Sequence, residues 1–154
     1  MIAKNLYKKL IKNGFTIAFS ESITGGSVSA ELVKIPNASQ VFIGSIVAYQ
    51  KISKTHVLGI DNKVIERYSI VSQEVAVEMA KQTSKKFNAT ISIGITGNAG
   101  PTFEPNTNEQ KALIAIKIFD DMHVFELDLK GLTRLQSIKK TTQFVYRKCD
   151  ELIP

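Results

Sequence analysis

The chain has 154 residues, of which 44% are hydrophobic and 22% charged, the composition of one globular domain with its own core. Its net charge of +6 comes mainly from 17 scattered lysines, a pattern that favours a solvated surface over a nucleic-acid interface. No apolar run approaches the roughly 20 residues of a membrane span, residues 1–12 do not resemble a signal peptide, and the single cysteine fits a reducing compartment. We therefore expect one cytoplasmic domain over residues 1–154, with no membrane or nucleic-acid partner.

The first half of the chain alternates helical and strand patterns. Apolar residues at four-residue spacing predict a helix over residues 1–13, which Gly14 ends. The short apolar run 15–19 predicts a buried strand, and a helix follows from about Thr24 to before Pro36. A second strand is expected over residues 41–49. Residues 51–67 predict two short helices separated by Gly59.

The second half begins with Ser72, a suitable N-cap for a helix that extends to about Lys86. Residues 90–95 predict a buried strand, which leads into a loop up to about residue 110. Residues 112–119 and 123–129 predict a hairpin that turns at residues 120–122. A last helix is expected over residues 134–152, with an apolar stripe facing the sheet. The stripe consists of Leu135, Ile138, Thr142, Val145, Cys149 and Leu152, so that Cys149 is expected to be a buried structural thiol.

This order of elements predicts an α/β fold with a mainly parallel sheet and helices on both faces. The hairpin requires at least one antiparallel strand, which makes the sheet mixed. In open sheets of this kind, ligands bind beyond the carboxyl ends of the parallel strands. Three polar segments follow such ends, residues 20–26, 49–54 and 96–101. We expect these distant segments to meet at one edge of the sheet.

The segment 20–26 reads S-E-S-I-T-G-G and lies between a strand and a helix. Its two glycines permit backbone N–H groups to approach a ligand, and a helix N-terminus favours an anion or oxyanion. The hydroxyls of Ser22 and Thr24 are expected at the mouth of such a site. Because Ser and Thr caps are common, residue chemistry alone favours a plain N-cap followed by a turn. Glu21 either orients a base or closes the turn, and its spacing leaves both roles open.

The other two segments also have a functional and a structural interpretation. A lysine such as Lys54, one helical turn past a strand end, acts as a general base only if burial or nearby positive charge lowers its pKa; otherwise it is a solvated helix lysine. Small residues in T-G-N-A-G-P, residues 96–101, permit a substrate to approach the backbone, or form a flexible loop. His56 and His123 lack the carboxylate or cysteine neighbours of a metal site, so no metal is expected.

In this order and at this spacing, the three segments resemble the motifs of a known family. Residues 20–26 are similar to (A/S)-E-S-C-T-G-G, with Ile23 in place of the cysteine. Tyr49 and Lys54 match Y-x-x-x-x-K, and residues 95–101 are similar to a stretch that contains (T/S)-G-x-A-G-P. These motifs characterise the CinA C-terminal domain family. The similarity runs in one register from about residue 5 to residue 101 and is less clear beyond.

The resemblance implies a three-layer α/β/α domain with a mixed five-stranded sheet. It also implies hydrolysis of nicotinamide mononucleotide, a small phosphorylated nucleotide, to nicotinate mononucleotide and ammonia, with no metal or cofactor. By position, Ser22 is expected to be the nucleophile and Lys54 its general base, a Ser-Lys dyad. The expected substrate-binding residues are Thr24, Gly25, Gly26, Tyr49, Thr96, Gly97 and Arg134, the last near the substrate phosphate.

Residues 102–112 depart from the family pattern, because they lack its glycine-rich turn and the K-P-V-G that precedes the next strand. This segment lies near the expected substrate. Two alternatives therefore stay open beside the deamidase: a catalytically inactive CinA-like module that binds a mononucleotide or another protein, and the same dyad acting on another amide. The sequence also leaves open whether the chain forms a homo-oligomer.

Overall fold

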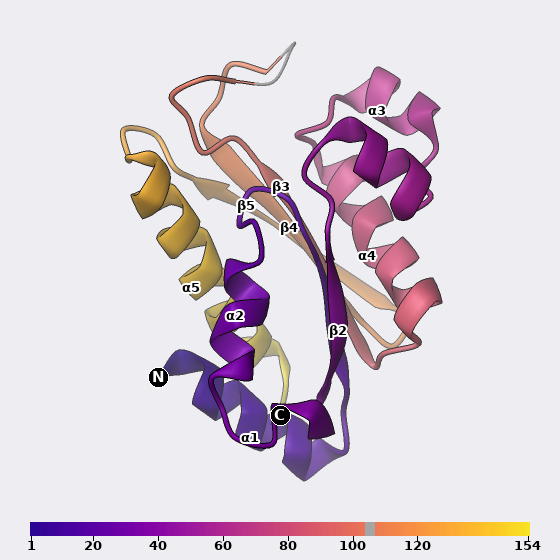
Figure 1. Cartoon of the computed structure of the whole chain (residues 1–154), viewed down its shortest axis with the longest axis vertical. Helices are drawn as coiled ribbons and strands as arrows, with labels where there is room; N and C mark the ends of the chain where they lie inside the picture. Colours follow the sequence, from indigo (N-terminus) through magenta and orange to yellow (C-terminus); the bar gives the residue numbers. More distant parts are fainter. Residues whose placement is uncertain (104–106) are drawn as a thin grey trace.

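The computed structural model describes residues 1–103 and 107–154, which fold around one five-stranded sheet (Figure 1). The strands are β1 (Ile17–Glu21), β2 (Phe42–Val47), β3 (Ile91–Gly97), β4 (Lys111–Ile118) and β5 (Asp121–Asp128), arranged in the order β2-β1-β3-β4-β5. β2, β1 and β3 are parallel, whereas β4 is antiparallel to both β3 and β5. Four strands therefore share one direction, and the expected mixed, mainly parallel sheet is confirmed.

Helices cover both faces of this sheet and complete the expected three-layer α/β/α fold (Figure 1). The α-helices are α1 (Ile2–Asn13), α2 (Ser27–Val33), α3 (Asn62–Tyr68), α4 (Gln73–Phe87) and α5 (Arg134–Leu152), with a 3-10 turn η1 (Ala38–Gln40) and a π-helical turn η2 (Ser53–Val57). α1, α2 and α5 pack together on one face, and α3 and α4 on the other. Across the described residues, no helix combines the length and hydrophobicity needed to cross a membrane.

Beside the first polar segment, two boundaries differ from the sequence prediction because of local backbone conformation. β1 continues to Glu21, and α2 begins at Ser27 instead of near Thr24. Gly25 and Gly26 have φ angles of 58° and 105°, which residues with side chains rarely adopt and which no α-helix contains. Residues 22–26 therefore form a turn between strand and helix, and this turn carries the first of the three polar segments.

The two central strands, β1 and β3, are buried between the helical layers. On one face of β3, three isoleucines join a large apolar cluster with α1 and α5. On the other face, a Cβ atom at Gly94 would lie 2.4 Å from the Ala76 carbonyl oxygen and 2.7 Å from the Ala80 nitrogen. The backbone of α4 thus packs directly on β3, and this close approach fixes the strand that leads to the third polar segment.

The predicted apolar stripe of α5 is buried in its later turns but not in its first. Val145 and Cys149 are buried as expected, and burial raises the pKa of the Cys149 thiol, which keeps the thiol neutral. Leu135 is 80% exposed, so the prediction was wrong for this residue. The side chain of the preceding residue, Arg134, points to the loop after β3, where it donates to the Gly100 carbonyl. Successive residues of an α-helix project about 100° apart, so Leu135 cannot point in the same direction. Leu135 therefore points away from the sheet.

The contact between β3 and α4 can be tested by adding one methyl group. Gly94→Ala should lower the free energy of unfolding by about 3 kcal/mol, because the methyl would overlap the α4 backbone. Ser92→Ala, on the same face of β3, is the matched control. Ser92 Oγ is buried and has no hydrogen-bond partner among the described residues, so its removal should leave stability unchanged or raise it. Urea unfolding measures both, and a fully stable Gly94→Ala variant would contradict the described packing.

Candidate active site

The parallel strands β2, β1 and β3 end together at one edge of the sheet. Glu21, the last residue of β1, is paired with Val47 of β2 and Ile95 of β3. One residue further, the Ser22 N–H donates to the Ile95 carbonyl (3.0 Å), and the Ala48 N–H donates to the Glu21 carbonyl (2.7 Å). Both neighbours of β1 therefore hold the backbone at the point where Ser22 leaves the sheet.

Lys54 lies against Ser22 at this edge. The Lys54 Nζ atom is 2.8 Å from Ser22 Oγ, and the two residues are 1% and 7% exposed. Nζ also donates to the carbonyl oxygens of Ala48 (2.7 Å) and Tyr49 (3.2 Å). Carbonyl oxygens only accept, whereas a neutral amine has two N–H groups and one lone pair. The protonated amine donates to all three oxygens, Ser22 Oγ included; in the neutral form, with its two N–H groups on Ala48 and Tyr49, the lone pair would face the serine hydroxyl.

The π-helical turn η2 brings Lys54 back under the end of β2. Its wide turn is stabilised by buried Leu58, which packs with Ala48 in an apolar cluster that also includes Met79 of α4. The Ile60 N–H donates to the Lys54 carbonyl (3.0 Å) and so fixes the backbone of Lys54. Single π-turns recur at functional sites, because they place a side chain where a regular α-helix would not.

Glu21 closes the turn between β1 and α2, one of the two roles considered for it. Its carboxylate is fully buried and accepts five hydrogen bonds. The donors are the hydroxyls of Thr24 (2.6 Å) and Ser29 (2.6 Å) and the N–H groups of Gly26 (3.2 Å), Val28 (3.0 Å) and Ser29 (3.0 Å). The positive end of α2 is thereby occupied by a protein carboxylate. These N–H groups are not free to bind an anion of a substrate.

A polar pocket of about 170 Å³ opens in front of Ser22. Its lining comes from all three segments, from the residues that follow the third and from α5, and consists of Ser22, Ile23, Tyr49, Gly97, Asn98, Ala99, Thr102, Phe103 and Arg134. The Arg134 guanidinium donates to the Gly100 carbonyl (2.9 Å) and to the Tyr49 hydroxyl. This bridge ties α5 to two strand ends and places a positive charge at the pocket.

The chain matches the family model of the CinA C-terminal domain over residues 1–153. It belongs to this family. A CinA-like protein of Fervidobacterium nodosum is 43% identical over 97 residues, which cover 63% of this chain and 24% of that protein. A putative competence-damage inducible protein of Lysinibacillus sphaericus is 33% identical over 154 residues, covering 97% of this chain and 37% of that protein. The chain thus spans only 24% and 37% of the length of these two relatives.

Solved structures of CinA proteins share the fold. The crystal structure of a competence or damage-inducible protein from Enterobacter asburiae has a TM-score of 0.93 at 25% identity, covering 97% of this chain and 94% of that one. A CinA superfamily protein from Escherichia coli has a TM-score of 0.94 at 24% identity, covering 99% and 88%. These likenesses support the α/β/α assignment across nearly the whole chain.

The structure brings together some of the residues expected at the CinA site and not others. Tyr49, Gly97 and Arg134 line the pocket beside Ser22, with Lys54 directly behind it. A Cβ atom at Gly97 would lie 2.5 Å from the Lys111 carbonyl oxygen, so the close packing of β3 and β4 requires glycine there. Because Ser22 both lines the pocket and contacts Lys54, the pocket and the dyad form one continuous site.

Four expected substrate-binding residues have hydrogen-bond groups that are engaged elsewhere. The N–H groups of Gly25 and Gly26 donate to the Ser22 carbonyl and to Glu21, and the Thr24 hydroxyl also donates to Glu21. The Thr96 hydroxyl donates to the Ile70 carbonyl (3.0 Å) in the loop before α4. As described, Thr24 and Thr96 support the turn and the loop instead of lining the pocket.

Several pocket residues were not singled out from the sequence. Asn98 and Ala99 lie within the T-G-N-A-G-P segment, whose small residues already marked it as a place of close approach. Thr102 and Phe103 belong to the unusual segment 102–112, of which residues 104–106 lie outside the described residues. The resemblance placed this segment near the substrate, but it did not single out Thr102 or Phe103.

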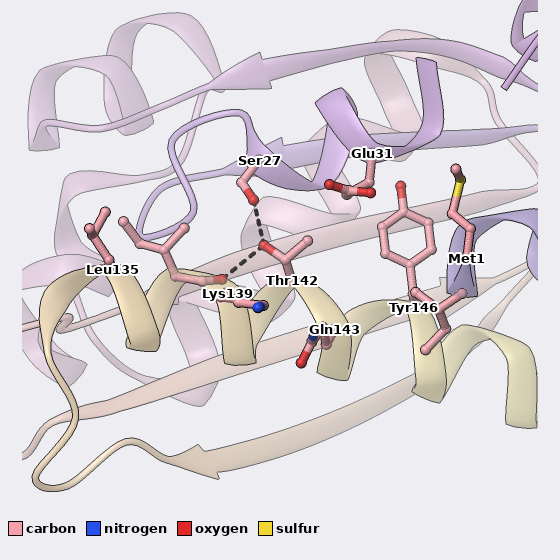
Figure 2. Close-up of a pocket in the computed structure, with 10 residues that line it drawn as sticks. Met1, Ser27, Glu31, Leu135, Lys139, Thr142, Gln143 and Tyr146 are labelled. Atoms are coloured by element: carbon pink, nitrogen blue, oxygen red, sulfur yellow. Dashed lines mark hydrogen bonds between the residues drawn. The ribbon is translucent and has the colours of Figure 1, made fainter. Parts of the chain in front are cut away.

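A larger pocket of about 350 Å³ lies away from the dyad, between α2, α5 and the start of α1 (Figure 2). Ser27 and Thr142 form a hydrogen bond (2.7 Å) across it, and exposed Leu135 lines its rim. It contains neither Ser22 nor Lys54. Among the described residues, no group of three His, Cys, Asp or Glu side chains is placed to hold a metal ion.

The position of the Thr96 hydroxyl yields a stability prediction. Thr96→Val should lower the free energy of unfolding by about 1 kcal/mol, because the Ile70 carbonyl loses its donor. Thr96→Ser keeps the hydroxyl and should restore most of this loss, apart from the missing methyl group. Urea unfolding at neutral pH measures both variants. Equal stability of Thr96→Val and the wild type would show that the hydroxyl does not hold the loop.

Proposed function

We propose that the chain is an amide hydrolase of the nicotinamide-mononucleotide deamidase type. In this reaction, nicotinamide mononucleotide and water give nicotinate mononucleotide and ammonia. The observation that carries the proposal is the 2.8 Å contact between Lys54 Nζ and Ser22 Oγ, both buried behind a polar pocket. The identity of the substrate rests on family membership and on the motifs around these two residues.

The first half of the reaction transfers the acyl group to Ser22. The hydroxyl proton passes to the Lys54 amine while Ser22 Oγ bonds to the carboxamide carbon, giving a tetrahedral intermediate. The carbonyls of Ala48 and Tyr49 hold the amine N–H groups, so the lone pair is already oriented for this transfer. When the C–N bond breaks, Lys54 returns the proton to the nitrogen, which leaves as ammonia.

In the second half, water attacks the ester carbon on Ser22, and Lys54 takes a proton from that water. The ester bond then breaks, Ser22 Oγ regains the proton from Lys54, and nicotinate mononucleotide leaves. The same base therefore acts in both halves, and the residues present supply each proton that the two steps need.

The negative charge on the carboxamide oxygen needs N–H donors during the attack. The N–H groups of Gly25 and Gly26 are engaged with the Ser22 carbonyl and with Glu21. In the described part of the chain, the Ile23 N–H donates to no protein acceptor, and Ile23 lines the pocket. As the first N–H after the nucleophile, it is our candidate donor to the oxyanion.

The pocket suits one end of the substrate. Its volume of about 170 Å³ is below the ~300 Å³ at which pockets for drug-sized ligands begin. It would therefore take the carboxamide ring and leave the ribose phosphate outside. Arg134 at the rim supplies positive charge for the phosphate. The cationic pyridinium ring would disfavour a second positive charge nearby and so favour the neutral Lys54 amine.

A second candidate is the same dyad acting on another amide. The supporting observation is that Thr102 and Phe103, from the segment that departs from the family pattern, line the pocket. Side chains at this position would contact the substrate and could change which amide fits. A panel of primary amides with and without a ribose phosphate separates this candidate from the deamidase.

Substitutions in the dyad test the proposed reaction. Ser22→Ala and Lys54→Met should each lower kcat/KM for ammonia release from nicotinamide mononucleotide at least about a thousandfold, because each removes a group that acts in every step. Lys51→Met changes an exposed lysine of the same segment and should leave turnover unchanged. A folded wild-type protein that releases no ammonia, or a fully active Ser22→Ala, would refute the proposal.

A further inference from the structure

Glu21 is a buried carboxylate next to Ser22 that the proposed reaction does not use. It is completely inaccessible to solvent, and it is not among the residues that line the pocket. Its two oxygens accept five hydrogen bonds from the turn and the first residues of α2. A group enclosed in this way cannot touch the substrate, so any effect on the reaction must act through the residues that it holds.

We propose that Glu21 is a positioning residue that sets the Ser22–Lys54 geometry from both sides, a role that rests on the proposed function. Its side chain fixes the turn that carries the nucleophile. Its backbone carbonyl fixes the strand end that carries the partners of the base. One residue thus borders both members of the dyad.

On the nucleophile side, Glu21 replaces a missing cap. The N-cap position of α2 is Gly26, which has no side chain to accept the first N–H groups of the helix. The Glu21 carboxylate accepts them from the preceding strand and also binds the Thr24 hydroxyl. Two glycines with left-handed backbone make this turn deformable on its own. The carboxylate therefore holds Ser22 within a closed loop between β1 and α2.

On the base side, a short series of hydrogen bonds leads from Glu21 to Lys54. The Ala48 N–H donates to the Glu21 carbonyl (2.7 Å), and the Lys54 amine donates to the Ala48 carbonyl (2.7 Å). A displacement of the Glu21 backbone would therefore move both the nucleophile and an acceptor that orients the base. Misplacement of reacting groups by about 1 Å can reduce a rate a hundredfold.

Glu21→Gln tests this role with little change in size. The amide NH₂ group cannot accept from the N–H groups of α2, so one half of the cap is lost. The kcat for nicotinamide mononucleotide should fall about 30- to 300-fold, whereas KM should change less than about threefold, because no pocket residue is altered. Glu31→Gln is the matched control. Glu31 lies on α2 and pairs with Lys34 (2.6 Å), and its substitution should leave both constants unchanged.

A milder variant covers the case in which Glu21→Gln does not fold. Ser29→Ala keeps the carboxylate but removes the hydroxyl that contacts both Glu21 (2.6 Å) and Ser45 of β2 (2.7 Å). Its kcat should fall about three- to tenfold at unchanged KM, since one of the five hydrogen bonds is lost. A Ser29→Ala variant with wild-type kcat would count against the positioning role.

Crystal structures of the wild type and Glu21→Gln make the test independent of turnover. In the variant, the Ser22 Oγ–Lys54 Nζ distance should increase from 2.8 Å to beyond about 3.5 Å, the limit of a hydrogen bond, while the strands stay in place. A wild type without turnover would overturn the proposed function alone. An unchanged contact in folded Glu21→Gln, or an unchanged kcat in an active enzyme, would overturn the role of Glu21.

Discussion

The hydrogen bonds that continue the parallel sheet one residue beyond β1 are the constraint on which the candidate site depends. Through them, the Ser22 N–H is held by β3 and the Glu21 carbonyl by the residue after β2. Because β1 and β2 end at the same level and β3 extends only to Gly97, two residues past the partner of Glu21, segments far apart in the chain meet there without long loops. Close packing of α4 on Gly94 keeps β3 in this position. The edge of the sheet thus provides a rigid support for a nucleophile and a base.

Among the residues that the structure describes, two ionisable side chains, Glu21 and Lys54, are buried at this edge. Burial of a charge is costly unless hydrogen bonds satisfy it. Glu21 is satisfied by the first N–H groups of α2 and by two hydroxyls, whereas the Lys54 amine contacts two backbone carbonyls and Ser22. The carboxylate shapes the turn, and in the proposed reaction the amine moves the protons. This division explains why a glutamate beside the nucleophile does not need to reach the pocket.

The topology and the proximity of Ser22 and Lys54 could be predicted from the sequence, whereas the direction of several side chains could not. Strand and helix periodicity placed three polar segments at one edge, and the motif order selected Ser22 and Lys54. The hydroxyls of Thr24 and Thr96 follow the same strand ends, but their acceptors are Glu21 and Ile70, and no local pattern specifies them. Leu135 fits the helical period, yet its exposure depends on how α5 begins beside Arg134.

The most direct test of this account is to locate the covalent intermediate. The protein is mixed with nicotinamide mononucleotide, quenched in acid during turnover and digested, and the peptide that contains Ser22 is analysed by mass spectrometry. The account predicts a peptide that is heavier by the acyl group of nicotinate mononucleotide, with the modification on Ser22 and absent from Ser22→Ala. Ammonia release with the acyl group on another residue, or with Ser22 unmodified throughout turnover, would contradict it.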